Sequence, residues 1–361
     1  MVYAIDDSER ATLLHYLTAP DEAACLHLVR DLHRGGATAE RLLTDLIAPV
    51  QAQVGDLWRA NRLTVGEEHA ATYITERLIA AAVECAGPIR SRRAHIVVAC
   101  ASGEWHSLPA RLVGDVLRLH GWTVEFLGAN VPTAQLAAYA ADRRPVAALF
   151  SATLTSRLPQ LSQSVQSCRD LRIPTLVGGA ACGERGDLGR RIGADAWAPD
   201  AATTVTALLD WPPAPAESTV QERAAEEYAQ LTRDHWRLID HMMRRLAQHY
   251  PPLRQYSAVR FESVTAQLEY LLDFLASAVF LDEDAVLVDF TRWLGPTLLA
   301  HGESVQLVQI ALAAIDEVVA GLPRSRRILN AGMAAFRESA TAPAYPGPRA
   351  QQLNVPYRPG D

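Results

Sequence analysis

The fold is decided by four short apolar runs in the middle of the chain: His95-Ile-Val-Val-Ala-Cys100, Thr123-Val-Glu-Phe-Leu127, Val146-Ala-Ala-Leu-Phe150 and Thr175-Leu-Val-Gly-Gly179. A fifth, weaker run lies at 196–198. Each run is separated from the next by a segment long enough for a helix, and such alternation is typical of parallel strands joined by right-handed crossovers. Residues 93–211 are therefore predicted to form a doubly wound, flavodoxin-like α/β domain, which binds ligands at the carboxyl ends of its strands.

Helical patterns lie on both sides of this domain. In residues 7–88 apolar residues recur at helical spacing, and breaks at Pro20, Gly35-Gly36 and Asn61 divide the segment into a four-helix bundle. After a Pro-rich linker at 212–217, residues 218–340 are helical throughout, and the proline-rich tail at 341–361 is expected to be disordered. The sequence thus predicts a multidomain protein in which a bundle, an α/β domain and an all-α domain follow one another.

Composition excludes several classes of function. The chain has 361 residues, of which 49% are apolar and 21% charged, as expected for a globular protein of two or three domains. A net charge of -7 offers nucleic acid no attraction, and neither a signal peptide nor a membrane-spanning stretch is evident. We therefore expect a cytoplasmic protein with no nucleic-acid and no membrane partner. The five cysteines form no C-x-x-C pair and no disulfide framework.

The segment after the first predicted strand reads Gly103-Glu-Trp-His-Ser-Leu-Pro109, which places a histidine and a carboxylate where α/β sheets bind ligands. A neutral imidazole is a good ligand for a transition metal, and its second nitrogen commonly donates to a carboxylate that fixes the tautomer. His106 is therefore a candidate metal ligand, with Glu104 as the partner of its second nitrogen. On this segment alone, an ordinary loop histidine is the alternative.

The same segment resembles the D-x-H-x-x-G motif of cobalamin-binding domains, with Glu104 in place of the Asp and Pro109 in place of the Gly. Ser151-Ala-Thr153 resembles the family's S-x-L element, and Gly178-Gly179 matches its glycine pair, whose lack of a Cβ allows close approach of a ligand. The resemblance implies that cobalamin binds with its nucleotide tail inside the domain and His106 on cobalt. The implied contacts are Glu104, His106, Ser107, Gly128, Val131, Ser151, Thr153, Gly178 and Gly179.

In the bundle, nine residues separate Trp58 from the pair Glu68-His69. This spacing resembles the helical cap of light-sensing, adenosylcobalamin-binding regulators of the CarH kind, in which photolysis of the cobalt–carbon bond rearranges the bundle. The resemblance implies that Trp58, Val65, Glu68 and His69 cover the upper face of the cofactor. The alternative is that the tryptophan is bundle core and the Glu-His pair a solvated helix start. Those regulators carry a histidine after the tryptophan, whereas this chain has Arg59, so the upper ligand after photolysis stays open.

The combination with a helical C-terminal domain resembles the photocobilins, photoreceptors that add a biliverdin-binding, globin-like domain. By this resemblance, Arg254, Arg260 and Arg292 would bind the propionates, and Tyr256 and Tyr270 would stack on the pyrroles. No cysteine follows Cys182, so the biliverdin would be non-covalent. A dimerisation module is the alternative for this domain.

Together these patterns predict a photoreceptor and not an enzyme. We expect a homo-oligomer, most simply a dimer, whose assembly changes with light. No kinase, cyclase or DNA-binding signature is present in the sequence, so the downstream signalling protein is unknown. Two alternatives remain open, namely a corrinoid methyl carrier that serves a methyltransferase and a cobalamin sensor that is indifferent to light.

Overall fold

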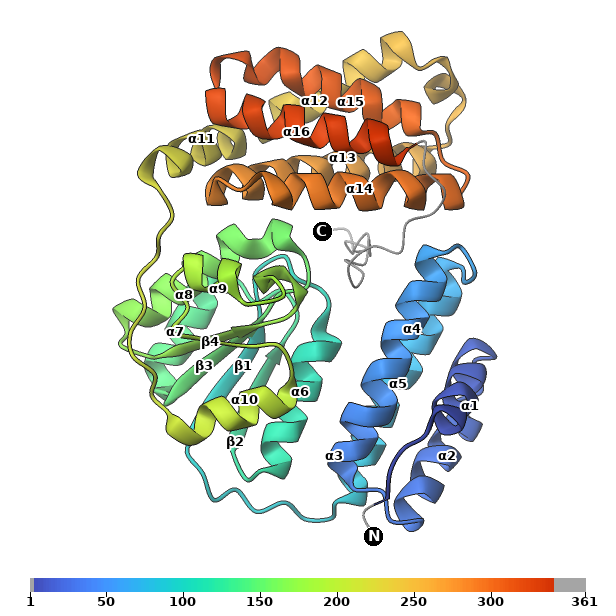
Figure 1. Cartoon of the computed structure of the whole chain (residues 1–361), viewed down its shortest axis with the longest axis vertical. Helices are drawn as coiled ribbons and strands as arrows, with labels where there is room; N and C mark the ends of the chain where they lie inside the picture. Colours follow the sequence, from blue (N-terminus) through green and yellow to red (C-terminus); the bar gives the residue numbers. More distant parts are fainter. Residues whose placement is uncertain (1–2, 341–361) are drawn as a thin grey trace. The chain divides into compact units, whose positions relative to one another are not determined.

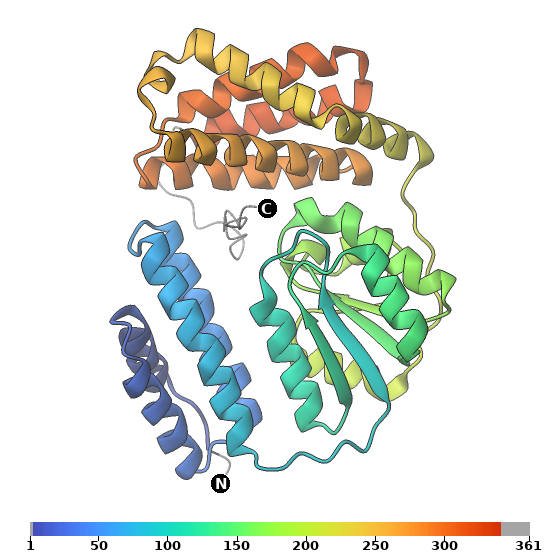
Figure 2. The same cartoon turned by 180° about the vertical axis from the view of Figure 1, so that it is seen from behind.

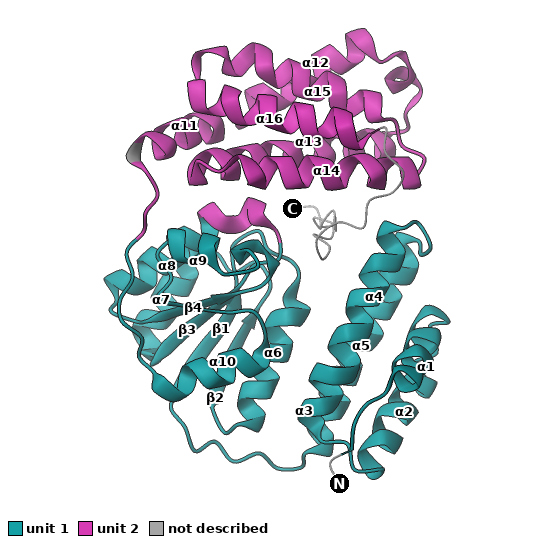
Figure 3. Ribbon diagram, in the orientation of Figure 1, with its two compact units in different colours: residues 1–153, 160–217 teal, residues 154–159, 218–361 magenta. Residues whose placement is uncertain are grey.

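The computed structural model of the chain describes residues 3–340 (Figure 1). The tail predicted to be disordered, at 341–361, lies outside the described residues. The chain divides into two compact units (Figure 3). The first unit comprises the residues up to 153 together with 160–217, and the second comprises 154–159 together with the residues from 218 onward.

The N-terminal part of the first unit is a helical bundle, as predicted. Its elements are α1 (Asp7–Thr18), α2 (Glu22–Arg34), α3 (Ala39–Arg41), the π-helical turn η1 (Leu42–Ile47), α4 (Ala48–Arg59) and α5 (Val65–Cys85). Because α3, η1 and α4 follow one another without a break, they form one rod, and the bundle has four. The turns at Gly36 and Asn61 have positive φ angles, which glycine and asparagine tolerate best.

The α/β part of the first unit is a five-stranded parallel sheet, which confirms the predicted fold of this domain. Its strands are β1 (His95–Cys100), β2 (Thr123–Gly128), β3 (Ala147–Ser151), β4 (Thr175–Gly178) and β5 (Ala196–Ala198). The strand order is β2-β1-β3-β4-β5, the flavodoxin-like order, in which the sequence direction reverses between β1 and β3. Ligands of this fold bind beside that reversal, at the carboxyl ends of β1 and β3.

Helices cover both faces of the sheet. They are α6 (Ser107–Leu119), α7 (Thr133–Arg143), α8 (Leu158–Asp170), α9 (Asp187–Arg191) and α10 (Ala201–Ala207), with 3-10 turns η2 (Thr155–Arg157), η3 (Ala180–Cys182) and η4 (Leu208–Asp210). Helix α10 lies in front of the sheet in Figure 1, and α7 lies in front of it in the reverse view of Figure 2. The core below α6 and α10 includes Ile96, Val98, Leu117 and Leu208.

Helix α6 also joins the sheet to the bundle. Val116 of α6 belongs to the same buried cluster as the bundle core, and Leu108 and Leu112 pack against that cluster. At the end of the helix, His120 Nε2 lies 3.1 Å from a carboxylate oxygen of Glu40. Because α6 begins at the residue after His106, the candidate metal ligand is attached to the helix that contacts the bundle.

The second unit is helical, as predicted for the C-terminal region; its globin-like packing stays a prediction. It contains α11 (Glu222–Arg233), α12 (His235–His249), η5 (Pro251–Gln255), α13 (Ala258–Leu281), α14 (Asp284–Ala300), α15 (Val305–Val318), η6 (Val319–Gly321) and α16 (Pro323–Ser339). Helix α13 is long and apolar enough to span a membrane, but 61% of its most apolar window is buried in the protein, as in the core helix of a globular domain.

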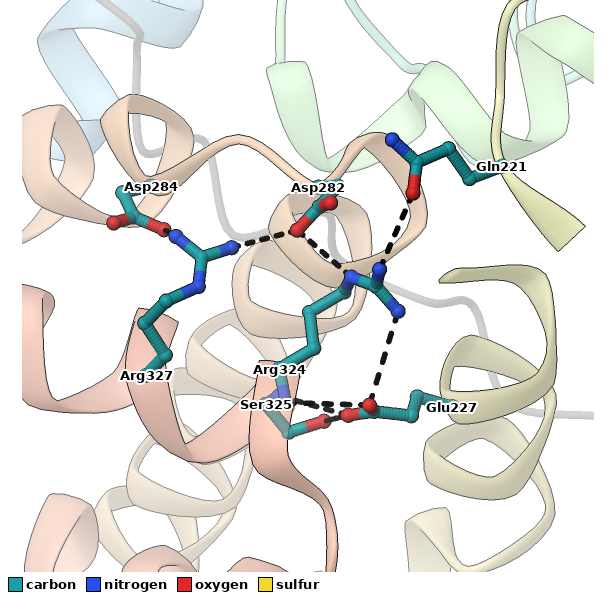
Figure 4. Close-up of polar contacts among 7 residues, drawn as sticks. All are labelled: Gln221, Glu227, Asp282, Asp284, Arg324, Ser325 and Arg327. Atoms are coloured by element: carbon teal, nitrogen blue, oxygen red, sulfur yellow. Dashed lines mark hydrogen bonds and ion pairs between the residues drawn. The ribbon is translucent and has the colours of Figure 1, made fainter. Parts of the chain in front are cut away.

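Polar contacts fix the start of α16 against α11 and the end of α13 (Figure 4). Asp282 accepts hydrogen bonds from Arg324 Nε at 2.7 Å and Arg327 Nη2 at 2.6 Å. The hydrogen bond from Arg324 is the main reason that the pKa of Asp282 lies below its ordinary value. Glu227 accepts hydrogen bonds from the backbone N–H groups of Arg324 and Ser325. Both residues lie in the first turn of α16, where backbone N–H groups have no acceptor within the helix. Charged groups thus hold three helices in register.

Candidate functional site

The loop after β1 brings Glu104 and His106 into direct contact. Glu104 Oε1 lies 2.5 Å from Nδ1 of His106 and accepts a second hydrogen bond, of 2.9 Å, from the His106 backbone N–H. Glu104 Oε2 accepts a hydrogen bond of 2.6 Å from the backbone N–H of Thr153, in the loop after β3. The Glu104 side chain is fully buried, so at least three N–H groups converge on one carboxylate that water does not reach.

These contacts determine the state of the imidazole. Burial acts to raise the pKa of Glu104, but the hydrogen bonds from His106 and Thr153 outweigh it and hold the pKa below its ordinary value. An ionised carboxylate only accepts hydrogen bonds, so Nδ1 of His106 carries a proton, and in the neutral imidazole Nε2 is then the nitrogen with the lone pair.

The second imidazole nitrogen fits a metal ligand. Nε2 of His106 is buried and has no hydrogen-bond partner among residues 3–340, and the side chain is only 9% exposed. Burial of a nitrogen lone pair without a partner costs free energy, which a bound cobalt would recover. The residues present therefore fit a cofactor that takes one protein nitrogen as a metal ligand.

Three loops meet at this edge of the sheet. The backbone N–H of Gly103 donates to Asn130 Oδ1 at 2.7 Å, and the backbone N–H of Asn130 donates to the Glu104 carbonyl at 2.8 Å. The Ala101 N–H donates to the Ser151 carbonyl at 3.2 Å. Hydrogen bonds therefore join the loops after β1, β2 and β3, the last of which also reaches Glu104 through Thr153.

Asn130 was not among the residues predicted from the sequence. The predicted residues of the same loop are Gly128, which ends β2 with a φ of +84°, and Val131, which is half-buried. Asn130 has a φ of +49°, a conformation that asparagine adopts more readily than most residues. An asparagine between a strand and a helix start was the available signal for a residue that fixes the loop. Ser107 lies half-buried at the first position of α6.

Contacts with the chain's own backbone explain the glycine pair after β4. Gly179 has a φ of +92°, and a Cβ on it would lie 2.3 Å from the Ala152 carbonyl oxygen. A Cβ on Gly178 would lie 3.0 Å from the Ala198 carbonyl oxygen. Neighbouring backbone thus requires a glycine at 179, whereas at 178 it leaves only a tight fit for a Cβ, whether or not a ligand approaches. The glycine pair of the cobalamin-binding motif is present, but the group that approaches Gly179 closely is the backbone of Ala152, in the loop after β3.

The four bundle residues predicted to cover the upper face lie on α4 and α5. Trp58 is half-buried and packs against the bundle core. Glu68 is buried, accepts a hydrogen bond of 2.8 Å from the Thr72 hydroxyl, and lies 2.8 Å from Nδ1 of His69. The side chain of His69 is 53% exposed and Val65 is 54% exposed. The alternative interpretation, a solvent-exposed helix start, therefore fits Val65 and His69 but not the buried Glu68.

The five residues predicted to bind biliverdin lie at separate places in the described part of the second unit. Arg260 stacks over the ring of Tyr256, 4.5 Å from its centroid. Tyr270 is ten residues further along α13, about 15 Å of helical rise, and is buried beside a cavity of about 20 Å³, room for roughly one water molecule. Arg254 and Arg292 are exposed on η5 and α14. The helical rise separates residues that lie near one another in the sequence, and the biliverdin set stays a prediction.

The fold and the histidine in the loop after β1 define a flavodoxin-like α/β protein with a candidate metal-cofactor site at the strand reversal. Two family models, both described as a B12 binding domain, match the chain: one matches residues 94–209 and the other residues 9–82. The bundle and the α/β domain together are thus a cobalamin-binding module.

Among curated proteins, the chain is similar to the HTH-type transcriptional repressor CarH of Myxococcus xanthus, with 30% identity over 146 residues. The match covers 38% of this chain and 46% of the repressor, so it spans less than half of that relative. Similar solved structures include the monomethylamine corrinoid protein of Methanosarcina barkeri (20% identity, TM-score 0.48, 57% of this chain and 99% of that one) and the methanol:cobalamin methyltransferase complex MtaBC of the same organism (17%, 0.32, 58% and 82%).

Replacement of Glu104 by glutamine tests the carboxylate that orients His106. A glutamine has one carbonyl oxygen and one NH₂ group, so at least one of the N–H donors now facing the carboxylate loses its acceptor. We expect the free energy of unfolding of the first unit to fall by about 1–3 kcal/mol and the Thr153 amide to exchange its hydrogen faster. Urea denaturation and hydrogen exchange of the cobalamin-free chain measure both effects.

The matched control is Glu125→Gln, because Glu125 also contacts a histidine, His95 at 3.0 Å, but is partly exposed. This variant should lose less stability than Glu104→Gln and leave exchange at Thr153 unchanged. Equal effects of the two substitutions would contradict the proposed convergence of donors on Glu104.

Proposed function

We propose that this chain is a light sensor that binds adenosylcobalamin, with Nε2 of His106 as the lower ligand of cobalt. The observation that carries the proposal is the buried Nε2, which has no hydrogen-bond partner in the described part of the chain, on an imidazole whose Nδ1 contacts Glu104. The two B12 binding domain matches support the cofactor class, and the likeness to a repressor supports a regulatory role. The adenosyl form and the response to light rest on the resemblance of the Trp58 to His69 spacing to light-sensing regulators.

The residues of the chain have defined parts in this proposal. When bound, adenosylcobalamin supplies a cobalt–carbon bond that light can break. Glu104 keeps the proton on Nδ1 of His106 and so keeps Nε2 available as a ligand. His106 immediately precedes α6, whose Leu108 and Leu112 pack against the bundle core. A displacement of His106 would therefore reach the bundle through one helix.

The bundle residues would cover the upper face. Trp58 provides an indole for the adenosyl group, and Glu68 orients the imidazole of His69 as Glu104 orients that of His106. Arg59, at the position of the second histidine of the light-sensing regulators, is ion-paired with Asp56 at 2.6 Å. His69 is then the imidazole of this segment that could approach cobalt once the adenosyl group has left.

We further propose that the chain acts as a homodimer whose assembly changes on illumination, that it is not an enzyme, and that an unidentified cytoplasmic signalling protein reads its state. Because the repressor matches over less than half of its length, its DNA binding is not transferred to this chain. A methyl carrier for a methyltransferase and a light-independent cobalamin sensor remain the alternatives that the experiments must distinguish.

Replacement of His106 by alanine tests the cobalt ligand. Without the imidazole, the variant should lose the absorption spectrum of imidazole-ligated cobalamin and bind the cofactor about tenfold or more weakly. His120→Ala is the control, because His120 lies at the far end of α6 and pairs with Glu40. The control should keep the wild-type spectrum. If the purified His106→Ala protein also keeps it, another group ligates the cobalt and the assignment is refuted.

Illumination with green light separates the three functions. Because the cobalt–carbon bond of the free cofactor is itself light-labile, the decisive measurement is the molecular mass in solution and not the spectrum alone. A sensor loaded with adenosylcobalamin should change its oligomeric state on illumination, whereas protein loaded with hydroxocobalamin should not. Assembly that depends on cobalamin but is equal in dark and light would favour the light-independent sensor. Demethylation of the methyl-loaded protein by a methyltransferase, without change in mass, would favour the methyl carrier.

Biliverdin in the second unit rests on the resemblance to photocobilins alone. If it binds, adding biliverdin to the full-length protein should produce a far-red absorption band, and the pigment should extract into acidified organic solvent because no cysteine follows Cys182. An absorption spectrum that shows only cobalamin after purification with excess biliverdin would contradict biliverdin binding and favour a dimerisation module at residues 218–340.

A further inference from the structure

The second unit contains six residues that lie outside the C-terminal region of the sequence. Residues 154–159 follow the loop after β3 and group with the helical unit, whereas residues on either side of them group with the α/β domain (Figure 3). The chain therefore passes from the first unit to the second at the peptide bond between Thr153 and Leu154, and returns before Gln160.

One face of α13 holds this segment. The buried Ser277 hydroxyl donates a hydrogen bond of 2.6 Å to the Thr155 carbonyl. Arg157 Nη1 lies 3.0 Å from Asp273 Oδ2, and its guanidinium group lies over the ring of Tyr270 at 5.8 Å. Residues 270, 273 and 277 have the i, i+3, i+7 spacing of one helix face. A single stripe of α13 thus contacts the segment through three different interactions.

At the other end of the same loop, Thr153 binds Glu104, the hydrogen-bond partner of the candidate cobalt ligand His106. The Thr153 N–H donates to Glu104 Oε2, and Leu154 is the next residue of the chain. Leu154 and Ser156 are each only 2% exposed, and interiors packed in this way leave little room for a segment to shift without moving its neighbours. A displacement at Thr155 can be absorbed only by the few backbone rotations between it and Thr153.

We infer that α13 positions the candidate cobalt ligand, and that Ser277, Asp273 and Arg157 are positioning residues for His106. These residues hold segment 154–159 in place, and this fixes the position of the Thr153 N–H. The Thr153 N–H in turn orients the Glu104 carboxylate, which orients the imidazole of His106. The link to cobalt rests on the proposed function, whereas the link to the Glu104–His106 pair does not. Because coupling of this kind is reciprocal, occupation of the cobalt site also changes the protection of α13 from hydrogen exchange. The helical unit is then the element through which the state of the cofactor is read.

The test compares full-length Ser277→Ala and Asp273→Asn proteins with wild type. Ser325→Ala is the matched control, since Ser325 is also fully buried in the second unit but its hydroxyl donates to Glu227. In cobalamin-free protein we expect exchange of the Thr153 amide to accelerate about fivefold or more in the two test variants, within the usual range of coupling between sites. Nitrogen NMR should show a smaller population of the His106 tautomer protonated at Nδ1. The control should match wild type in both measurements.

With hydroxocobalamin bound, the two test variants should show a weaker imidazole-ligated spectrum, and Arg157→Lys, which keeps a donor for Asp273, should lie between them and wild type. Wild-type exchange and an unchanged His106 tautomer in both test variants would overturn the inference. So would faster exchange that leaves the tautomer unchanged, because the segment would then be held for structural reasons only. If wild type itself lacks the imidazole-ligated spectrum, the proposed function fails, and the two cobalamin-free measurements alone decide whether α13 positions His106.

Discussion

The buried carboxylate of Glu104 is the interaction on which the site depends. It receives N–H groups from its own loop and from the loop after β3, while its backbone carbonyl receives the N–H of Asn130 from the loop after β2. Three loops that begin on separate strands therefore share one residue. A glutamate is one methylene longer than the aspartate of the related motif, so one oxygen can remain on His106 while the other reaches Thr153. The departure from the motif is thus consistent with a firmer hold on the imidazole.

The sheet could be predicted because its central strands are buried on both faces. The runs at β1, β3 and β4 are almost continuously apolar for that reason, whereas β2, at the edge, is partly exposed along its length. The four rods of the bundle could also be predicted from helical spacing and from the turns at Gly36 and Asn61. The π-helical turn at 42–47 could not, because its apolar residues fit an uninterrupted α-helix equally well.

The contact between Glu104 and His106 could be predicted from the sequence, whereas the backbone contact from Thr153 could not. His106 and Glu104 are neighbours that follow a strand, so their contact could be anticipated from position. The S-x-L resemblance selected Thr153 as a contact of the cofactor, but not its backbone hydrogen bond to Glu104, 49 residues away, because backbone groups leave no mark on residue identity. Gly178 and Gly179 gave a correct signal of close approach, but the approaching group is the chain's own Ala152 and Ala198. The arginine and tyrosine set stays a prediction, because proximity in sequence specifies neither direction around a helix nor distance along it.

The discontinuous second unit affects the order in which the protein can mature on the ribosome. All strands of the sheet have been synthesised by residue 198, so the α/β domain can begin to fold while the rest of the chain is still being made. Thr155, however, meets its partner Ser277 only 122 residues later. Until α13 emerges, the loop beside Glu104 lacks the contacts that hold it in the finished protein. If α13 positions His106 as we infer, a nascent chain acquires its sheet early and the final orientation of the histidine only after α13 has been made.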